Sequence, residues 1–179
     1  IKKGYLIADL KFNIDEFGAL KNDYKVNGLL KEGEISVFKK NKIEKINFIF
    51  NIEENNFNFK DISFDANNIN FLSDRLDINK DKKNYLLEGS LRNKKSVLND
   101  QILQVIKLKY PQFDLINTEF ESKNDFTFNI NDKFKVKNLS INSSILINSS
   151  QLKRNNLIDK NFIEINEFID LKDHEIKAS

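Results

Sequence analysis

The stretch from Ile46 to Phe64 reads INFIFNIEENNFNFKDISF, and it decides the fold. Apolar side chains alternate with polar ones in both of its halves, although Ile49 breaks the alternation in the first. Such a period of two is typical of a β-strand that buries one face. The polar run Glu53 to Asn56 separates the halves, and Asn is frequent in tight turns. The stretch therefore predicts two antiparallel strands joined by a short turn.

The same alternation recurs along most of the chain. It covers Leu6 to Ile14, Tyr24 to Gly28, Ile35 to Val37 and Ile69 to Ile78. Turns rich in Asn, Asp or Gly separate these segments, and Asp15 to Gly18 is an example. Short strands with such connections favour antiparallel meanders, because parallel strands need long crossover connections.

One segment departs from this period. Between residues 96 and 110 the apolar residues lie closer to helical spacing, with Ser96 as a candidate N-cap and Pro111 just beyond the end. This predicts one helix near residues 96–110, which would lie across one end of the strands as a cap or a plug. Near the C-terminus, Ile158 to Ile169 have helical spacing and Phe168 to Leu171 fit the start of a strand, so we favour a helix that runs into a strand.

An internal repeat relates the two halves of the chain. The segment Phe50 to Phe64 matches Phe128 to Ile141, with one turn residue missing from the second copy. A second match pairs Tyr24 to Gly28 with Tyr85 to Gly89, and a shorter echo begins at Phe12. Repeats of this kind indicate stacked copies of one structural unit. We place the approximate repeat units at 1–90 and 91–179.

Both copies of the repeat share an irregularity in their alternation. The apolar parity flips at Lys60-Asp61 and again at Lys137-Asn138. A flip within a strand turns its apolar face outward unless a β-bulge or a sharp bend intervenes. We therefore expect a bulge at each place, which curves the sheet. The predicted fold is mostly β: a curved antiparallel β-sheet, as an open trough or β-groove of meander repeats, with the one helix near residues 96–110.

Charge and composition exclude several classes of function. The 29 Lys and Arg residues nearly balance the 27 Asp and Glu residues, so the chain carries no basic field for nucleic acid. It has no Cys and a single histidine, His174, in a charged segment. One imidazole cannot form a His-rich metal site, and neither a phosphate-binding glycine loop nor a nucleophile motif occurs. We expect no enzyme activity, no cofactor, no metal and no nucleic-acid partner.

The apolar side chains of the alternating strands are the candidate functional residues. From the pattern alone they fit either a filled core or a groove that holds acyl chains. Many of them are bulky aromatic residues, and the chain holds only 5 Gly to make tight corners. The groove candidates are Phe48, Phe50, Ile52, Phe57, Phe59, Ile62, Phe64, Phe126, Phe128, Ile130, Phe134, Val136, Leu139 and Ile141.

The order of these segments resembles the repeats of the bacterial AsmA-like proteins of the TamB and YhdP type. Those repeats combine an extended segment ending in Val-x-Gly, an amphipathic strand, a short Asn or Asp turn and a strand containing Ile or Leu with Ser. The resemblance covers roughly residues 4 to 150, and its motifs are patterns of residue class. It is carried by Leu10–Gly18, Tyr24–Gly28, Ile43–Ile52, Phe57–Phe64, Ile69–Ile78 and Tyr85–Gly89.

The resemblance implies a bridge-like lipid-transfer protein. Such a protein is anchored in the inner membrane by an upstream helix, crosses the periplasm and conducts phospholipid between the inner and outer membranes along an apolar β-groove. Its partners are phospholipid acyl chains and, through the missing parts of the chain, the two membranes. The family offers no catalytic motif to transfer. The implied location is the periplasm, with the anchor in a segment absent from this fragment.

Two other readings remain open. The chain also fits a structural or adhesive β-repeat protein of the cell surface, or a β-sandwich binding domain with a filled core. Because Met is absent even at position 1 and the repeat units number about two, we expect residues 1–179 to be an internal fragment of a longer AsmA-like repeat protein. That chain would supply neighbours for the ends of the array.

Overall fold

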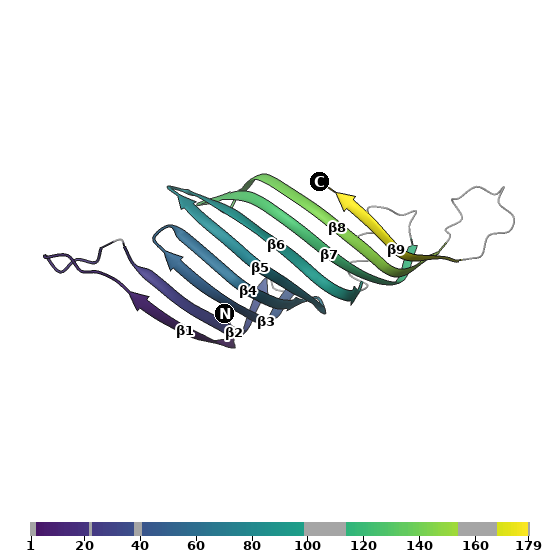
Figure 1. Cartoon of the computed structure of the whole chain (residues 1–179), viewed down its shortest axis with the longest axis horizontal. Coiled ribbons are helices and arrows are strands. Elements are labelled where there is room, and N and C mark those ends of the chain that lie inside the picture. Colours follow the sequence, from purple (N-terminus) through teal and green to yellow (C-terminus); the bar gives the residue numbers. More distant parts are fainter. Residues whose placement is uncertain (1–2, 22, 38–40, 99–113, 154–167, 179) are drawn as a thin grey trace.

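A computed structural model describes residues 3–21, 23–37, 41–98, 114–153 and 168–178. These residues form one sheet of nine antiparallel strands whose order in space is their order in the sequence. Figure 1 shows them side by side, with β1 and β9 at opposite edges, so the sheet is not closed. The strands are β1 (Lys3–Lys11), β2 (Lys25–Val37), β3 (Asn41–Glu53), β4 (Asn56–Ala66), β5 (Ile69–Asp81), β6 (Asn84–Val97), β7 (Asp114–Asn131), β8 (Val136–Lys153) and β9 (Phe168–Ala178).

Short turns join the strands, as the sequence predicts. Two-residue connections separate β3 from β4, β4 from β5 and β5 from β6. Asn67 and Asn68 both have positive φ angles, 51° and 63°, which is the backbone of a type I′ hairpin turn. In the Asp15 to Gly18 turn, the Asp15 carboxylate accepts hydrogen bonds from the N–H groups of Phe17 (2.9 Å) and Ala19 (2.8 Å). The antiparallel meander is therefore confirmed.

The two bulges predicted from the parity flips are present. Asp61 in β4 and Asn138 in β8 each have a φ of 52° within a strand. The pairing register shifts at both places, between β3 and β4 and between β7 and β8. The extra residue restores the apolar face, so Phe59 and Ile62 point to the same side of the sheet although they are three residues apart.

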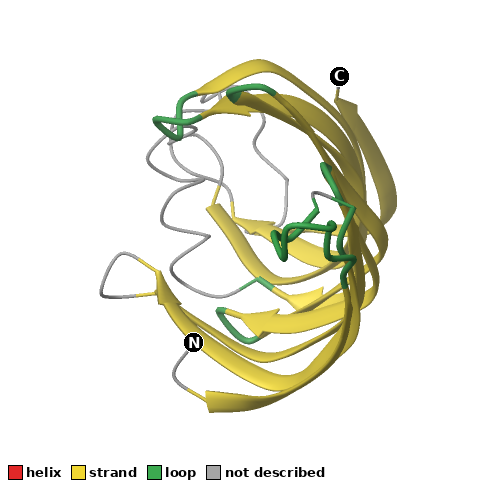
Figure 2. Ribbon diagram, turned by 90° about the vertical axis from the view of Figure 1, so that its left-hand side faces the viewer, coloured by secondary structure: helices red, strands yellow, loops and turns green. Residues whose placement is uncertain are grey.

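Further bulges bend the sheet along two lines. Glu32 in β2 and Lys45 in β3 have φ angles of 53° and 49°, and the register shifts beside both, close to the bulge at Asp61. The second line passes through Asn117 in β7, which has a φ of 50° beside a register shift with β8, whereas Asp173 in β9 has a φ of 51° without a register shift. Bulges increase local twist and bend a strand. Figure 2 shows the result, a sheet curved into a trough.

The two faces of the sheet differ in chemistry. Leu30, Phe50, Ile69 and Ile147 are the buried apolar side chains, and the register places all four on one face. Curvature crowds the side chains of the concave face and spreads those of the convex face. Since almost all buried residues share this face, it is the inner face of the trough. The opposite, outer face carries mainly Asn, Lys, Asp and Glu.

The trough shields its inner face only partly. The accessible surface is 13507 Å², whereas a compact monomer of 21.0 kDa exposes about 9000 Å². Most inner-face apolar residues of β2 to β8 are half-buried. A single curved layer with one apolar face is therefore the main feature of the described residues.

The predicted helix is wrong where it can be compared with the structure. Ser96 pairs with Phe120 inside β6 and β7, so it does not cap a helix, and Val97 is also in β6. The spacing of polar and apolar residues around Ser96 fits a strand as well as a helix, because the register shifts between Asn93 and Ser96. Residues 99–113 lie outside the described part, as does the C-terminal helix predicted from Ile158. The strand beginning at Phe168 is confirmed as β9.

The repeat corresponds to equivalent strands. Gly28 in β2 pairs with Phe50, and Gly89 in β6 pairs with Phe126, so a Phe ring covers a glycine in both copies. Matching these pairs makes Phe50 equivalent to Phe126, whereas the sequence match aligns it with Phe128. The difference of two residues is even and keeps each side chain on its face. Both copies thus place a glycine beneath a Phe ring of the following strand, and the repeat units at 1–90 and 91–179 stay a prediction.

Substitutions at the bulges test the role of the positive φ angles. Asp61→Gly should leave the free energy of unfolding nearly unchanged, because glycine adopts this backbone freely. Asp61→Val should lower it by about 1–2 kcal/mol, because a β-branched residue disfavours the left-handed region. Urea denaturation measures both, with Lys60→Val on the regular part of the strand as the control. Equal stabilities for the glycine and valine variants would contradict the bulge geometry.

The two glycines beneath Phe rings make a second test. A Cβ at Gly28 would collide with the backbone oxygen of Ile7 and lie 2.5 Å from Cζ of Phe50. At Gly89 the nearest atom, Cζ of Phe126, would lie 3.0 Å away. Gly28→Ala should therefore lower the free energy of unfolding by about 1–3 kcal/mol, and Gly89→Ala by clearly less. Thermal unfolding measures the stability of the two variants. A larger loss of stability for Gly89→Ala than for Gly28→Ala would contradict these contacts.

Candidate functional site

The inner face of the trough is the candidate site. Because paired residues of neighbouring strands share a face, the register defines rows of side chains that cross the strands. The strands follow one another along the length of the sheet in Figure 1, so these rows run along the trough. We call two of them the apolar rows. The first contains Leu10, Val26, Ile52, Phe57, Ile78, Leu87 and Phe128, and the second contains Ala8, Gly28, Phe50, Phe59, Leu76, Gly89, Phe126 and Ile141.

Aromatic contacts hold the first half of this surface together. The ring of Phe48 lies 5.4 Å from that of Phe59 in an edge arrangement and 6.1 Å from that of Phe50. Phe64 and Phe71 stack with their centroids 5.4 Å apart. Edge-to-face and offset pairs of this kind stabilise aromatic clusters beyond the burial of their area. These contacts form an aromatic surface on the inner face, and no second layer of strands covers it among the described residues.

The structure brings the predicted groove residues together on the inner face, with one exception. Phe134 lies in the turn between β7 and β8 with a φ of 56° and an exposed fraction of 87%. The Asn131 side chain forms this turn by accepting hydrogen bonds from the N–H groups of Lys133 (3.0 Å) and Lys135 (2.9 Å). The sequence match with Phe57 did not reveal the longer turn. Phe134 therefore lies outside the apolar rows.

Exposure varies along the candidate set. Phe50 is buried, and the other candidates in β3, β4 and β7 are half-buried. Val136, Leu139 and Ile141 at the start of β8 are exposed, with fractions of 53%, 58% and 43%. The pairing of β8 with β9 begins only at Ser143, so this part of β8 is an edge. The apolar surface is thus more open here than in the middle of the sheet.

Several inner-face residues are absent from the predicted set. Leu30, Ile69 and Ile147 are buried there, and Leu76, Ile78 and Leu87 belong to the apolar rows. Alternation was visible for Leu76 and Ile78, so the same signal could have added them. Leu30 follows Leu29 in the sequence, and a bulge comes two residues later, so its face was not visible from parity alone.

Polar side chains interrupt the inner face on β6, β7 and β8. We call Asn93, Ser122, Asn124 and Ser143 the polar notch. Asn93 pairs with Ser122, and Asn124 pairs with Ser143. Further along the same strands, Thr118 and Ser150 are also buried, and their hydroxyl oxygens lie 2.7 Å apart. Uncharged hydrogen-bonding groups thus lie beside the aromatic surface.

Charged side chains form pairs away from the apolar rows. Lys45 and Lys95 approach Asp65 and Glu119, each with a nitrogen–oxygen distance of 2.7 Å. Hydrogen bonds from Lys45 and Asn70 lower the pKa of Asp65, and those from Lys95 and Ser149 lower the pKa of Glu119. The hydrogen bonds to Asp65 and Glu119 in turn raise the pKa of Lys45 and of Lys95. These groups keep their ordinary charges at neutral pH and make the outer surface hydrophilic.

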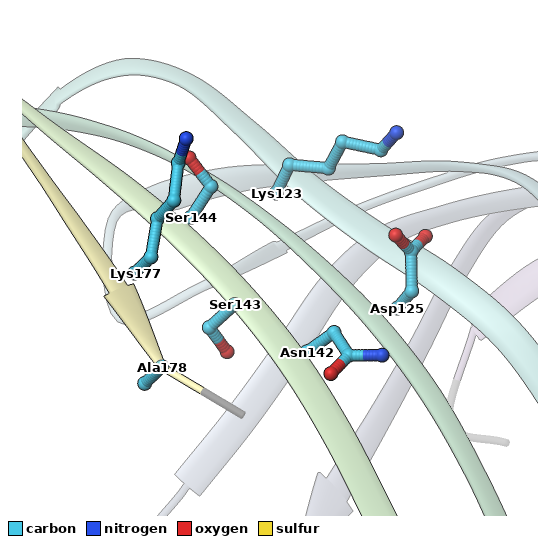
Figure 3. A pocket seen from close by; sticks show the side chains of 7 residues that line it. All are labelled: Lys123, Asp125, Asn142, Ser143, Ser144, Lys177 and Ala178. Carbon is cyan, nitrogen blue, oxygen red and sulfur yellow. The ribbon is translucent and has the colours of Figure 1, made fainter.

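Figure 3 shows a shallow depression near the C-terminal edge of the sheet. Lys123, Ser144 and Lys177 extend to the same side and come from β7, β8 and β9. Asp125 and Asn142 complete the lining on this side, and Ser143 and Ala178 border the depression although the register places their side chains on the inner face. Most of these residues point to the outer face, opposite the apolar rows. The depression contains neither a histidine nor a cysteine, and its mixed charges give it no strong preference for an anion or a cation.

The described residues contain neither a metal site nor a membrane-spanning helix. Among the described residues, no group of three or more His, Cys, Asp or Glu side chains is arranged to hold a metal ion. In the same part of the chain, no helix is long and apolar enough to cross a membrane. The arrangement that remains is an apolar inner surface with a neutral polar notch.

Comparisons with known proteins add no family to this geometry. No protein-family model, curated protein or solved structure matches the chain.

Proposed function

We propose that the trough binds phospholipid acyl chains and conducts them between the inner and outer membranes as a segment of a periplasmic AsmA-like protein. The observation that carries the proposal is the pair of apolar rows, which continue across β1 to β7 on the inner face of an open sheet. Exposing a lipid chain to water costs about 0.8 kcal/mol per CH₂. A continuous apolar surface offsets that cost along the whole path.

The length of the rows suits an acyl chain. Neighbouring strands lie about 4.8 Å apart, so a row that crosses seven strands is about 29 Å long. The hydrocarbon core of a bilayer is about 30 Å thick and holds two chain lengths end to end. One acyl chain therefore fits within a single row, and a second can follow it. Since the sheet is open at both edges, the rows have no wall across their ends within the described strands.

The kind of contact supports transport along the rows. Aromatic and aliphatic side chains attract a lipid chain without fixed direction, so the chain can slide past successive strands at little cost. Hydrogen-bonding groups would hold it at one position. The outer face, with its Asn, Lys, Asp and Glu side chains, remains hydrated throughout. This division explains why the chain carries many charges with little net charge.

A groove fits the architecture better than a filled core. A sandwich needs a second sheet to cover the apolar face, and all nine described strands belong to one sheet. The large accessible surface and the half-buried inner-face side chains also favour a groove over a filled core. Membership of the AsmA-like family, location in the periplasm and an inner-membrane anchor outside this chain are parts of the same proposal, and the resemblance of the repeats supports them.

Site-specific photocrosslinking tests the proposal. Benzoylphenylalanine replaces Phe50 or Phe128, and the protein is irradiated in cells and with phospholipid vesicles. Both positions should yield adducts whose added mass corresponds to a phospholipid, because both rings belong to the apolar rows. Mass spectrometry of the purified protein measures the adducts.

Matched controls lie one residue further along the same strands. Asn51 and Asn129 point to the outer face, so the photoreactive residue there should give several-fold less lipid adduct. Equal adducts from the two faces would indicate nonspecific membrane contact. Absence of adducts from both Phe50 and Phe128 would contradict a lipid-bearing interior.

A further inference from the structure

The polar notch interrupts rows that are apolar elsewhere. Asn93 is opposite Phe71 of β5 in the register, and Phe71 is opposite Phe64 of β4. The same row thus changes from two stacked rings to an amide and a hydroxyl as it passes from β4 to β7. Polar groups are costly to bury unless they form hydrogen bonds, so each group of the notch needs a partner in the protein or in a ligand. The notch is therefore a local chemical feature of the trough.

Internal hydrogen bonds fix most of the notch. Asn93, only 4% exposed, accepts a hydrogen bond from the Ser122 hydroxyl at 2.5 Å. Its amide nitrogen donates to the backbone oxygens of Lys94 at 2.9 Å and Phe120 at 3.3 Å. The amide nitrogen of Asn124 donates to Ser122 Oγ and to the Leu91 oxygen, both at 3.2 Å. Asn93 and Asn124 are thus held in one orientation.

Two polar groups of the notch remain available. Among the described residues, the hydrogen bonds of the Asn124 side chain all involve its amide nitrogen, and neither its Oδ1 atom nor the hydroxyl of Ser143 has a hydrogen-bond partner. Asn124 and Ser143 are register neighbours, so the acceptor and the hydroxyl lie side by side on adjacent strands. The register places them on the inner face, because Asn124 is two residues from Phe126 in β7, Ser143 is two residues from Ile141 in β8, and residues two apart in a strand share a face. A fixed acceptor and a rotatable hydroxyl therefore face the trough together.

The notch adjoins the aromatic end of the apolar rows. Phe126 follows Asn124 by two residues, a spacing of about 7 Å along the strand. The rings of Phe126 and Phe128 lie 5.8 Å apart and continue the surface. A ligand whose apolar chain lies on these rings would bring the group at the end of that chain to Asn124 and Ser143.

We propose that the polar notch binds the glycerol ester region of an acyl lipid whose chain lies on the apolar rows. The Ser143 hydroxyl donates to the ester carbonyl oxygen, and Asn124 Oδ1 accepts from the free glycerol hydroxyl of a lipid with one acyl chain, such as a lysophospholipid, because the glycerol of a two-chain phospholipid carries no hydroxyl. The notch contains no charged side chain, so it recognises the neutral ester and hydroxyl groups and leaves a phosphate to the solvent at the open side. This inference rests on the proposed function, because it requires a lipid chain in the trough.

A double substitution with a matched control tests the notch. Asn124→Leu with Ser143→Ala removes both available groups, and Asn142→Leu with Ser144→Ala makes the same chemical change on the outer face. Binding is measured for two probes, monopalmitoylglycerol and the hydrocarbon-like fluorophore N-phenyl-1-naphthylamine. The notch variant should lose about five- to fifty-fold in affinity for the glycerol ester, as expected for two hydrogen bonds, and bind the fluorophore as the unsubstituted chain does.

The outcomes separate the notch from the proposed function. Retained fluorophore binding shows that the notch variant is folded, and Ser143→Ala alone, a smaller change, should give part of the loss. Unchanged affinity for the glycerol ester would overturn the notch proposal and leave the lipid-binding trough in place. Equal losses for both probes, or a similar loss in the outer-face control, would overturn it as well. If the unsubstituted chain binds neither probe, the proposed function fails and the notch fails with it.

Discussion

The structure depends on keeping the apolar side chains of long strands on one face of a single sheet. A strand of regular pleat does this by strict alternation, but a long regular sheet resists sharp curvature. At Asp61 and Asn138 the break in the alternation coincides with one extra residue of positive φ. The extra residue both bends the strand and returns the next apolar side chain to the inner face. Curvature and amphipathicity thus have the same structural cause.

This coupling explains which parts of the fold were predictable. A parity flip between Phe59 and Ile62 is visible in the sequence because clear alternation surrounds it, and the bulge follows. The bulge at Asn117 is hidden, because Leu115 and Ile116 are adjacent and define no parity. Ser96 was misinterpreted because a bulged strand shifts its apolar spacing from two residues to three, which imitates a helix over a short segment.

The candidate site was predictable where it depends on single strands and not where it depends on pairing. Phe48, Phe50 and Phe59 are recognisable from alternation, but their ring contacts require the register between β3 and β4. The polar notch had no sequence signal, because Asn and Ser are common throughout the chain. It exists only because β6, β7 and β8 bring such residues to one place on the inner face.

The open edges follow from the same one-layer design. A sheet that closed into a barrel would satisfy its edges but would limit the size of the ligand to its lumen. An open trough leaves its first strand with exposed inner-face residues, Leu6 at 63% and Leu10 at 59%, and the start of β8 is equally uncovered. Exposed apolar edges promote pairing with further strands. A strand of the same alternating pattern that paired with either edge would extend the apolar rows in register. The unpaired edge strands of the single sheet would thus allow the trough to be lengthened without a change in its cross-section.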